Sequence, residues 1–269
     1  MHTKELLDAG HLVAAIEQLT QEVRAHPTDA RQRIFLFELL CFAGDYQRAA
    51  RQLDVIGHQN TTMAVGVQVY RSVLAAEEVR QRLFSDGLRP HFLFDPPPSV
   101  SLHLAAVQCL REGRPDEAKA LLEEAEHARP PLQGRLEGRP YHNFRDADDL
   151  FAPFLEVIAQ GLYVWLPFAQ IRHLRIAPPQ RLRDLLWASA TLESPYGSVG
   201  EVFLPVLYIG SSTHADEGIK LGRMTDWQNL GAGLVRGVGQ RLFLADDQDR
   251  AMLEVQDIEF AVEVPETQA

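Results

Sequence analysis

The hexapeptide GHLVAA at residues 10–15 has a counterpart, GDYQRA, at residues 44–49, which is 34 residues further along the chain. A period of 34 residues is that of tetratricopeptide repeats, in which each repeat is a pair of antiparallel helices. A third copy, GRPDEA, occupies residues 113–118, two periods and one residue after the second, so the copy between them is degenerate. These copies predict a helical repeat array in the N-terminal half of the chain.

The residue types within each copy suit a helical hairpin. Glycine permits a tight turn between two helices, a small side chain lets the helices approach closely, and proline prevents the second helix from continuing. Pro27 and Pro130 follow the first and third glycines by 17 residues. Alanine stands five residues after each glycine and leucine nine residues after it: Ala15, Ala49, Ala118, Leu19, Leu53 and Leu122.

Two further segments of this half have distinct patterns. Residues 31–43 are apolar around most of a helix circumference, which predicts a central helix, with Thr28 or Asp29 as its N-cap. Residues 84–98 contain an Asp-Gly pair and three consecutive prolines, which predict a long loop. Within it, Phe92 and Phe94 either pack under the array or form a contact surface for a partner.

The C-terminal half has the composition of a β-rich domain. Residues 148–160 are expected to form a short helix that Asp146 or Asp148 caps. Pro205 is expected at a bulge or at the end of its strand. The spacing leaves no room for the helices that parallel crossovers require, so we expect an antiparallel sheet. Residues rich in β-formers occur at 161–167, 184–192, 201–209, 241–244 and 258–264.

These patterns divide the chain into two domains. Residues 133–147 are rich in glycine, proline and polar residues and are expected to be a linker. The predicted fold is therefore multidomain, α followed by α+β. Residues 1–132 would form a tetratricopeptide-like α-α superhelix, and residues 148–269 a β-rich α+β domain with a mainly antiparallel sheet.

Composition and charge exclude several classes of protein. The chain has 26 lysines and arginines against 37 acidic residues, a net charge of −11, without a clustered basic face, so we expect no binding to nucleic acid. No apolar run reaches the length of a membrane span, and the N-terminus lacks the features of a signal peptide, which together predict a cytoplasmic protein. Cys41 and Cys109 lie in apolar helical patterns and are expected to be buried thiols.

Motifs that would carry enzymatic chemistry have simpler explanations. Residues 231–233, Gly-Ala-Gly, follow a polar segment and precede a strand, which predicts a hairpin loop and not a dinucleotide site. Asp146, Asp148 and Asp149 could chelate a hard cation, but helix capping explains them with fewer assumptions. The histidines and cysteines show no metal-binding spacing. We therefore expect no catalytic residue, no cofactor and no metal.

Two charged clusters are candidates for partner binding. The first consists of Arg172, Arg175, Arg181 and Arg183, which are either surface ion-pairing groups or a contact patch for an acidic partner. The second is the acidic C-terminal strip, represented by Asp246 and Asp247, which would suit a basic partner surface.

Four blocks in the C-terminal half, YVWLPF at 163–168, PPQRLRDLLW at 178–187, GEVFLPVLY at 200–208 and LGRMTDW at 221–227, resemble the ImpE family in sequence and order. This family, also called SciE or TagJ, consists of accessory proteins of bacterial type VI secretion systems. The resemblance implies a tetratricopeptide-like domain followed by an α+β domain, without enzymatic activity. It also implies binding to the N-terminal helix of the small sheath subunit, and through it a role in sheath recycling by the ClpV-type AAA+ ATPase.

Two hypotheses for the function follow. The first is a non-enzymatic adaptor, because a helical array presents a concave groove suited to an amphipathic partner helix. The second is an enzymatic or small-ligand-binding module in the C-terminal domain. It is suggested by residues in or near the motif blocks: Arg172, Arg183, Glu201, Asp226 and Trp227. Packing between strands and between domains would also explain the presence of these residues.

Overall fold

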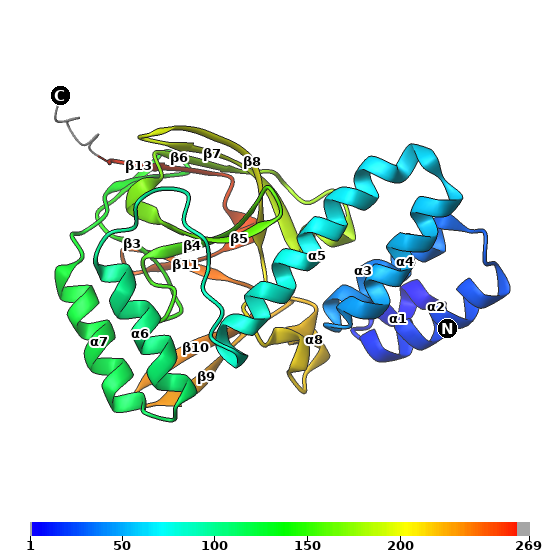
Figure 1. Cartoon of the computed structure of the whole chain (residues 1–269), viewed down its shortest axis with the longest axis horizontal. Helices are drawn as coiled ribbons and strands as arrows, with labels where there is room; N and C mark the ends of the chain where they lie inside the picture. Colours follow the sequence, from blue (N-terminus) through cyan, green and yellow to red (C-terminus); the bar gives the residue numbers. More distant parts are fainter. Residues whose placement is uncertain (1, 263–269) are drawn as a thin grey trace.

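The computed structural model describes residues 2–262. Helices occupy the N-terminal half and strands most of the remainder (Figure 1). The longer helices are α1 Thr3–Asp8, α2 Leu12–Ala25, α3 Ala30–Phe42, α4 Tyr46–Gln59, α5 Ala64–Ser85, α6 Ser99–Arg111 and α7 Pro115–Ala128. The predicted fold class, a helical region followed by an antiparallel sheet domain, is confirmed.

The repeat motifs lie at the turns between paired helices. Their glycines, Gly10, Gly44 and Gly113, have φ angles of 86°, 71° and 72°, a region that favours glycine. The motif alanines Ala15, Ala49 and Ala118 have no exposed surface. Helices α2 and α7 end before Pro27 and Pro130, so each expected feature of the hairpins is confirmed.

Helix α3 is the central helix that the sequence predicts. Asp29 caps it, because its Oδ1 accepts hydrogen bonds from the backbone N–H groups of Arg31 at 2.8 Å and Gln32 at 3.2 Å. Every residue from Leu36 to Phe42 is buried. Cys41 and Cys109 are buried free thiols, as expected.

The helices form two groups and not one continuous superhelix. Helices α1–α4 stack as two hairpins at one end of the molecule, while the α6–α7 hairpin lies at the other end, beside β9 and β10 (Figure 1). Helix α5 spans the distance between them and packs against β5. The degenerate repeat therefore corresponds to α5. The apolar face of this helix is buried against the sheet domain, so its residue types suit that contact and not the repeat pattern.

The strands form three sheets, and every pair of strands assigned within residues 2–262 is antiparallel. The largest sheet has the order β2-β1-β13-β6-β7-β8-β4-β5, and the smaller ones are β10-β9 and β12-β11-β3. Their bounds are β1 Gly134–Leu136, β2 Arg139–Tyr141, β3 Phe144–Asp146, β4 Phe154–Ala159, β5 Leu162–Pro167, β6 His173–Ile176, β7 Trp187–Ser194, β8 Gly197–Pro205, β9 Thr225–Gly231, β10 Leu234–Gly239, β11 Leu242–Ala245, β12 Gln248–Ala251 and β13 Asp257–Phe260.

Short helical elements connect the strands. They are the helix α8 Glu217–Lys220 and the 3-10 turns η2 Phe168–Gln170, η3 Leu182–Leu185, η4 Ser211–Thr213 and η5 Met252–Glu254; a further 3-10 turn, η1 Thr61–Met63, precedes α5. Pro205 is the last residue of β8, one of its two expected positions. In β13, Ile258 and Phe260 are buried and Glu259 is exposed, which confirms the predicted alternation there; residues 263 and 264 of the predicted strand lie outside the described residues.

Two sequence-based expectations are wrong. The helix predicted at residues 148–160 is a turn followed by β4, which is buried along its whole length between β8 and β5. A strand buried on both faces has a continuous apolar sequence that periodicity cannot distinguish from a buried helix. The predicted linker at 133–147 contains β1, β2 and β3. Each of these strands has only three residues, too few to show an alternation of apolar and polar side chains. The division of the chain into two domains near these residues stays a prediction.

Within residues 2–262, no helix combines the length and the apolar character that crossing a bilayer would require.

Candidate functional site

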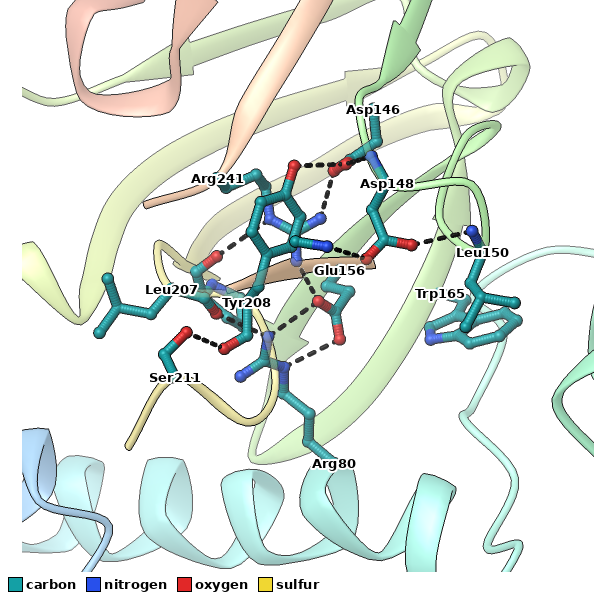
Figure 2. A network of polar contacts seen from close by, with 12 residues as sticks. Arg80, Asp146, Asp148, Leu150, Glu156, Trp165, Leu207, Tyr208, Ser211 and Arg241 are labelled. Atoms are coloured by element: carbon teal, nitrogen blue, oxygen red, sulfur yellow. Dashed lines mark hydrogen bonds and ion pairs between the residues drawn. The ribbon is translucent and has the colours of Figure 1, made fainter. Parts of the chain in front are cut away.

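A buried network of charged side chains joins helix α5 to the sheet domain (Figure 2). Glu77 and Arg80 are three residues apart on α5 and therefore point to the same side of the helix, toward the sheet. Arg80 Nη1 donates to Glu77 Oε1 at 2.8 Å. Trp187 Nε1, at the start of β7, donates to Glu77 Oε2 at 3.3 Å, so this pair already connects the helix with the sheet.

The centre of the network is the pair formed by Arg80 and Glu156 of β4. Arg80 Nε donates to Oε1 at 2.8 Å and Nη2 to Oε2 at 2.9 Å, a bidentate geometry that fixes both side chains (Figure 2). Arg80 Nη2 also donates to the carbonyl oxygen of Leu207 at 2.8 Å. Glu156 has no solvent-exposed surface, and Arg80 is 3% exposed.

Glu156 is held ionised by two guanidinium groups. Arg241 donates to its second oxygen and the hydroxyl of Tyr163 to its first. Trp165 Nε1 in turn donates to the Tyr163 oxygen at 2.6 Å. Burial alone would raise the pKa of Glu156, but the charges of Arg80 and Arg241 outweigh burial and lower that pKa to about 2.

Asp146 and Asp148 extend the network toward the β9–β10 ribbon. Asp146 accepts from Arg241, and also from the hydroxyl of Tyr208 at 2.8 Å and the backbone N–H of Asp148 at 2.8 Å. Asp148 accepts from the backbone N–H groups of Leu150 at 2.8 Å and Gly237 of β10 at 2.9 Å. These aspartates do not cap a helix; the structure shows them holding a turn and a strand in place.

Protonation of Asp148 gives a testable pH dependence. Burial, assisted by the charge of Asp146, raises the pKa of Asp148 from 3.8 to about 7. Between these two values the unfolded chain releases a proton that the folded chain keeps, so this group makes the free energy of unfolding fall as pH rises from about 4 to 7. The slope for one group is at most about 1.4 kcal/mol per pH unit. We expect the Asp148→Asn variant to lack this contribution.

Urea titrations of both proteins at several pH values between 4 and 7 measure that difference. The free energy of unfolding of the Asp148→Asn variant, minus that of the original chain, should increase as pH rises. A gap that stays constant over this range would show that Asp148 ionises in the folded protein as it does in the unfolded chain.

This network was missed at the level of the sequence, although one signal pointed to it. Glu156 is the single charged residue in the apolar run FLEVIA at residues 154–159, and a lone charge in a buried strand needs a buried partner. Arg80 and Arg241 lie 76 and 85 residues away in sequence, and their approach depends on the tertiary fold. Glu77, Glu156 and Asp146 are each paired with a guanidinium, and Asp148 accepts two backbone hydrogen bonds, so the arrangement of the network is that of a structural joint.

The structure separates the four predicted arginines. Arg172, Arg175 and Arg181 are exposed, whereas the Arg183 side chain is only 13% exposed. Arg183 Nη1 donates to Glu38 Oε1 of α3 at 3.1 Å, and its guanidinium lies 4.8 Å from the centre of the Tyr70 ring of α5. Arg183 therefore fastens η3 to the helical stack as an ion-pairing group, one of its two predicted roles, and its part in partner binding stays a prediction.

The remaining predicted partner residues have local contacts. Phe92 and Phe94 are partly buried against the core, and Phe94 packs on Tyr196 of the β7–β8 turn with 4.9 Å between ring centres, so this ring lies against the sheet domain. Asp246 and Asp247 are exposed in the β11–β12 turn. Asp246 Oδ1 accepts from the backbone N–H groups of His142 and Asn143, both at 2.9 Å, so it has a structural role beside any partner contact.

The residues that suggested a ligand site in the C-terminal domain lie on separate elements. Arg183 is in η3 and bonded to Glu38, as described above, and Glu201 is exposed on β8. Asp226 and Trp227 are on β9, where Asp226 Oδ2 lies 3.8 Å from His214 Nε2. The residues 231–233 form the turn of the β9–β10 hairpin, as predicted.

A groove opens beside the helical stack, between the α3–α4 turn, α4 and the middle of α5. Its volume is about 730 Å³. Small or apolar side chains line it, with charged groups among them: Ala43, Gly44, Asp45, Tyr46, Gln47, Ala50, Arg71, Leu74, Ala75 and Glu78. The network around Arg80 lies further along the same helix, so the wall of the groove formed by α5 is rigidly attached to the sheet domain.

Fold and site together define a two-part protein in which tetratricopeptide-like hairpins are fixed to an antiparallel sheet by a buried ionic joint. A family model described as ImpE protein matches residues 138–259. Over 260 residues the chain is 37% identical to the type VI secretion system accessory component TagJ of Pseudomonas aeruginosa, covering 97% of this chain and 91% of that protein. The chain belongs to the ImpE family, which confirms the resemblance seen in its motif blocks.

A crystal structure of a protein from Vibrio parahaemolyticus has the same fold. The two superpose with a TM-score of 0.90 over 97% of this chain and 98% of that chain, at 24% sequence identity.

Proposed function

We propose that this chain is a non-enzymatic accessory protein of a type VI secretion system, an adaptor that binds the N-terminal helix of the small sheath subunit. Its family membership supports the accessory role, because the Pseudomonas aeruginosa relative is a type VI secretion accessory component. Binding of the sheath helix would place the adaptor where it can modulate sheath recycling by the ClpV-type ATPase.

The observation that carries the proposal is the groove beside α4 and α5. Ala43, Ala50 and Ala75 line it, and such small side chains let the backbone of a docked helix come close. Tyr46 is partly exposed and offers some apolar surface for the apolar face of an amphipathic helix, whereas Leu74, 6% exposed, forms the floor of the groove. The charged side chains of the groove would pair with the polar edges of that helix.

Isothermal titration of a peptide with the sequence of that sheath helix tests the proposal. We expect saturable binding by the original chain and at least about tenfold weaker binding by Ala75→Arg, which is about 1.4 kcal/mol, because the long charged side chain fills the groove. Ala75 is exposed on α5, and arginine has a helix propensity close to that of alanine, so the helix itself should persist.

Ala120→Arg is the matched control. Ala120 is an exposed helical alanine on α7, at the opposite end of the molecule from the groove, and the same substitution there should leave peptide affinity unchanged (Figure 1). Equal weakening by both variants would place the binding outside the groove. If the original chain binds neither the peptide nor any intact sheath component, the adaptor proposal is rejected.

A further inference from the structure

Three side chains with metal-binding atoms meet on the two neighbouring strands β6 and β13. His173 of β6 lies directly opposite Glu259 of β13 in the antiparallel register, and Asp257 is two residues away along the same strand. His173 Nε2 and Asp257 Oδ2 are 2.8 Å apart. One ligand atom from each of the three residues lies within 4.8 Å of the other two.

We propose that His173, Asp257 and Glu259 bind a divalent transition-metal ion of the Zn²⁺ type. An imidazole nitrogen with two carboxylate oxygens is a donor set that suits zinc, whereas Mg²⁺ and Ca²⁺ prefer oxygen alone. Donors at about 2.0–2.2 Å from a tetrahedral ion lie about 3.3–3.6 Å from one another. Side-chain rotation alone can bring the three donors to that spacing, because the strand register already places them on one face.

The surroundings leave one side of the cluster open. The His173 side chain is 14% exposed and that of Asp257 39%, and Glu259 is exposed, so water can complete the coordination. Arg135 of β1 lies directly opposite Glu259 in the register and competes for this carboxylate. Arg175 is a second competing cation, with Nε 3.7 Å from Asp257 Oδ2. It also pairs with Glu193 Oε1 at 3.5 Å, so it keeps a partner when Asp257 turns toward an ion.

An ion at this position would cross-link β13 to β6. Strand β13 has four residues and lies between β1 and β6 in the large sheet. A ligand that binds the folded chain alone stabilises it in proportion to the logarithm of its concentration above the dissociation constant. Zinc should therefore raise the melting temperature and slow amide hydrogen exchange in β6 and β13.

Titration of untagged full-length protein with ZnCl₂ tests the site. We expect one ion per chain, no comparable heat with MgCl₂, and slower exchange confined to β6, β13 and their neighbours. Glu259→Gln and His173→Ala should each weaken zinc binding by at least about tenfold, since even groups that merely support a ligand are worth that much. Glu259 is exposed, so its conservative replacement keeps the test valid if the His173 variant folds poorly.

His142→Ala is the control for adventitious binding to a surface histidine. His142 is exposed and its side chain is outside the cluster, so zinc affinity should not change. The proposal is overturned if the original chain takes up no zinc, or if Glu259→Gln and His173→Ala bind zinc as tightly as the original chain.

Discussion

Replacing Arg80 with methionine is expected to lower the free energy of unfolding by about 3–5 kcal/mol, because it leaves a buried charge without its partner. Arg80 donates to both oxygens of Glu156, which has no exposed surface, and to Glu77. Arg241 alone would then have to compensate Glu156 while it also pairs with Asp146. Urea denaturation followed by circular dichroism measures the loss.

Arg82→Met is the matched control on the same helix. Arg82 pairs with Asp86 on the surface, with its side chain 49% exposed, and exposed ion pairs contribute little. We expect no measurable change from this variant. A similar stability for the Arg80 and Arg82 variants would contradict the role of the buried network as the joint between the helices and the sheet.

The second large effect is expected at Trp165, whose replacement by alanine should cost about 3–5 kcal/mol. Trp165 is fully buried on β5, stacks on Phe154 with 4.9 Å between ring centres, and contacts the ring of Phe151 edge-on. Its truncation would leave a cavity and remove the hydrogen bond that Tyr163 receives from the indole. The hydroxyl of Tyr163, which donates to Glu156, would then lack the hydrogen bond that orients it.

Trp227→Ala is the corresponding control, since this tryptophan of β9 is 39% exposed. Its removal should change stability by about 1 kcal/mol or less. Thermal or chemical unfolding of both variants gives the comparison. If the two variants lose equal amounts of stability, Trp165 of the motif block at residues 163–168 contributes no more to the core than the partly exposed Trp227.

The sequence indicates the helical hairpins well because their signals are local. Spacing alone places Gly10, Gly44 and Gly113 at tight turns, and the position of Asp29 before an apolar run predicts it as one of two candidate caps. Where structure depends on contacts distant in sequence, the same reasoning fails. The run at 154–159 reads equally well as helix or strand, and its pairing with β5 and β8 decides between them.

The same limit applies to the sites. Arg183 belongs to an arginine-rich surface segment by sequence, yet Glu38, 145 residues away, draws it into an interdomain contact. His173 and Asp257 are 84 residues apart, so no spacing rule brings them together, and only the register of β6 with β13 does so. The sequence predicts Asp146 or Asp148 as a helix cap, but no helix begins there, and the two carboxylates hold a turn and strand β10 instead.

The resemblance to the ImpE family rests on the motif blocks, and the structure gives several of their residues a reason in packing. Trp165 and Tyr208 are fully buried, and Trp187 reaches Glu77 of α5. These residues hold the sheet and the joint together. A partner helix would instead meet the small side chains beside α4 and α5.

Hydrogen–deuterium exchange with and without the sheath-helix peptide tests that central claim most directly. The account predicts slower exchange in the segments 43–50 and 71–78, which contain the residues that line the groove, and unchanged exchange in α6 and α7. Protection confined to α6–α7 or to the sheet domain, with none along the groove, would contradict it.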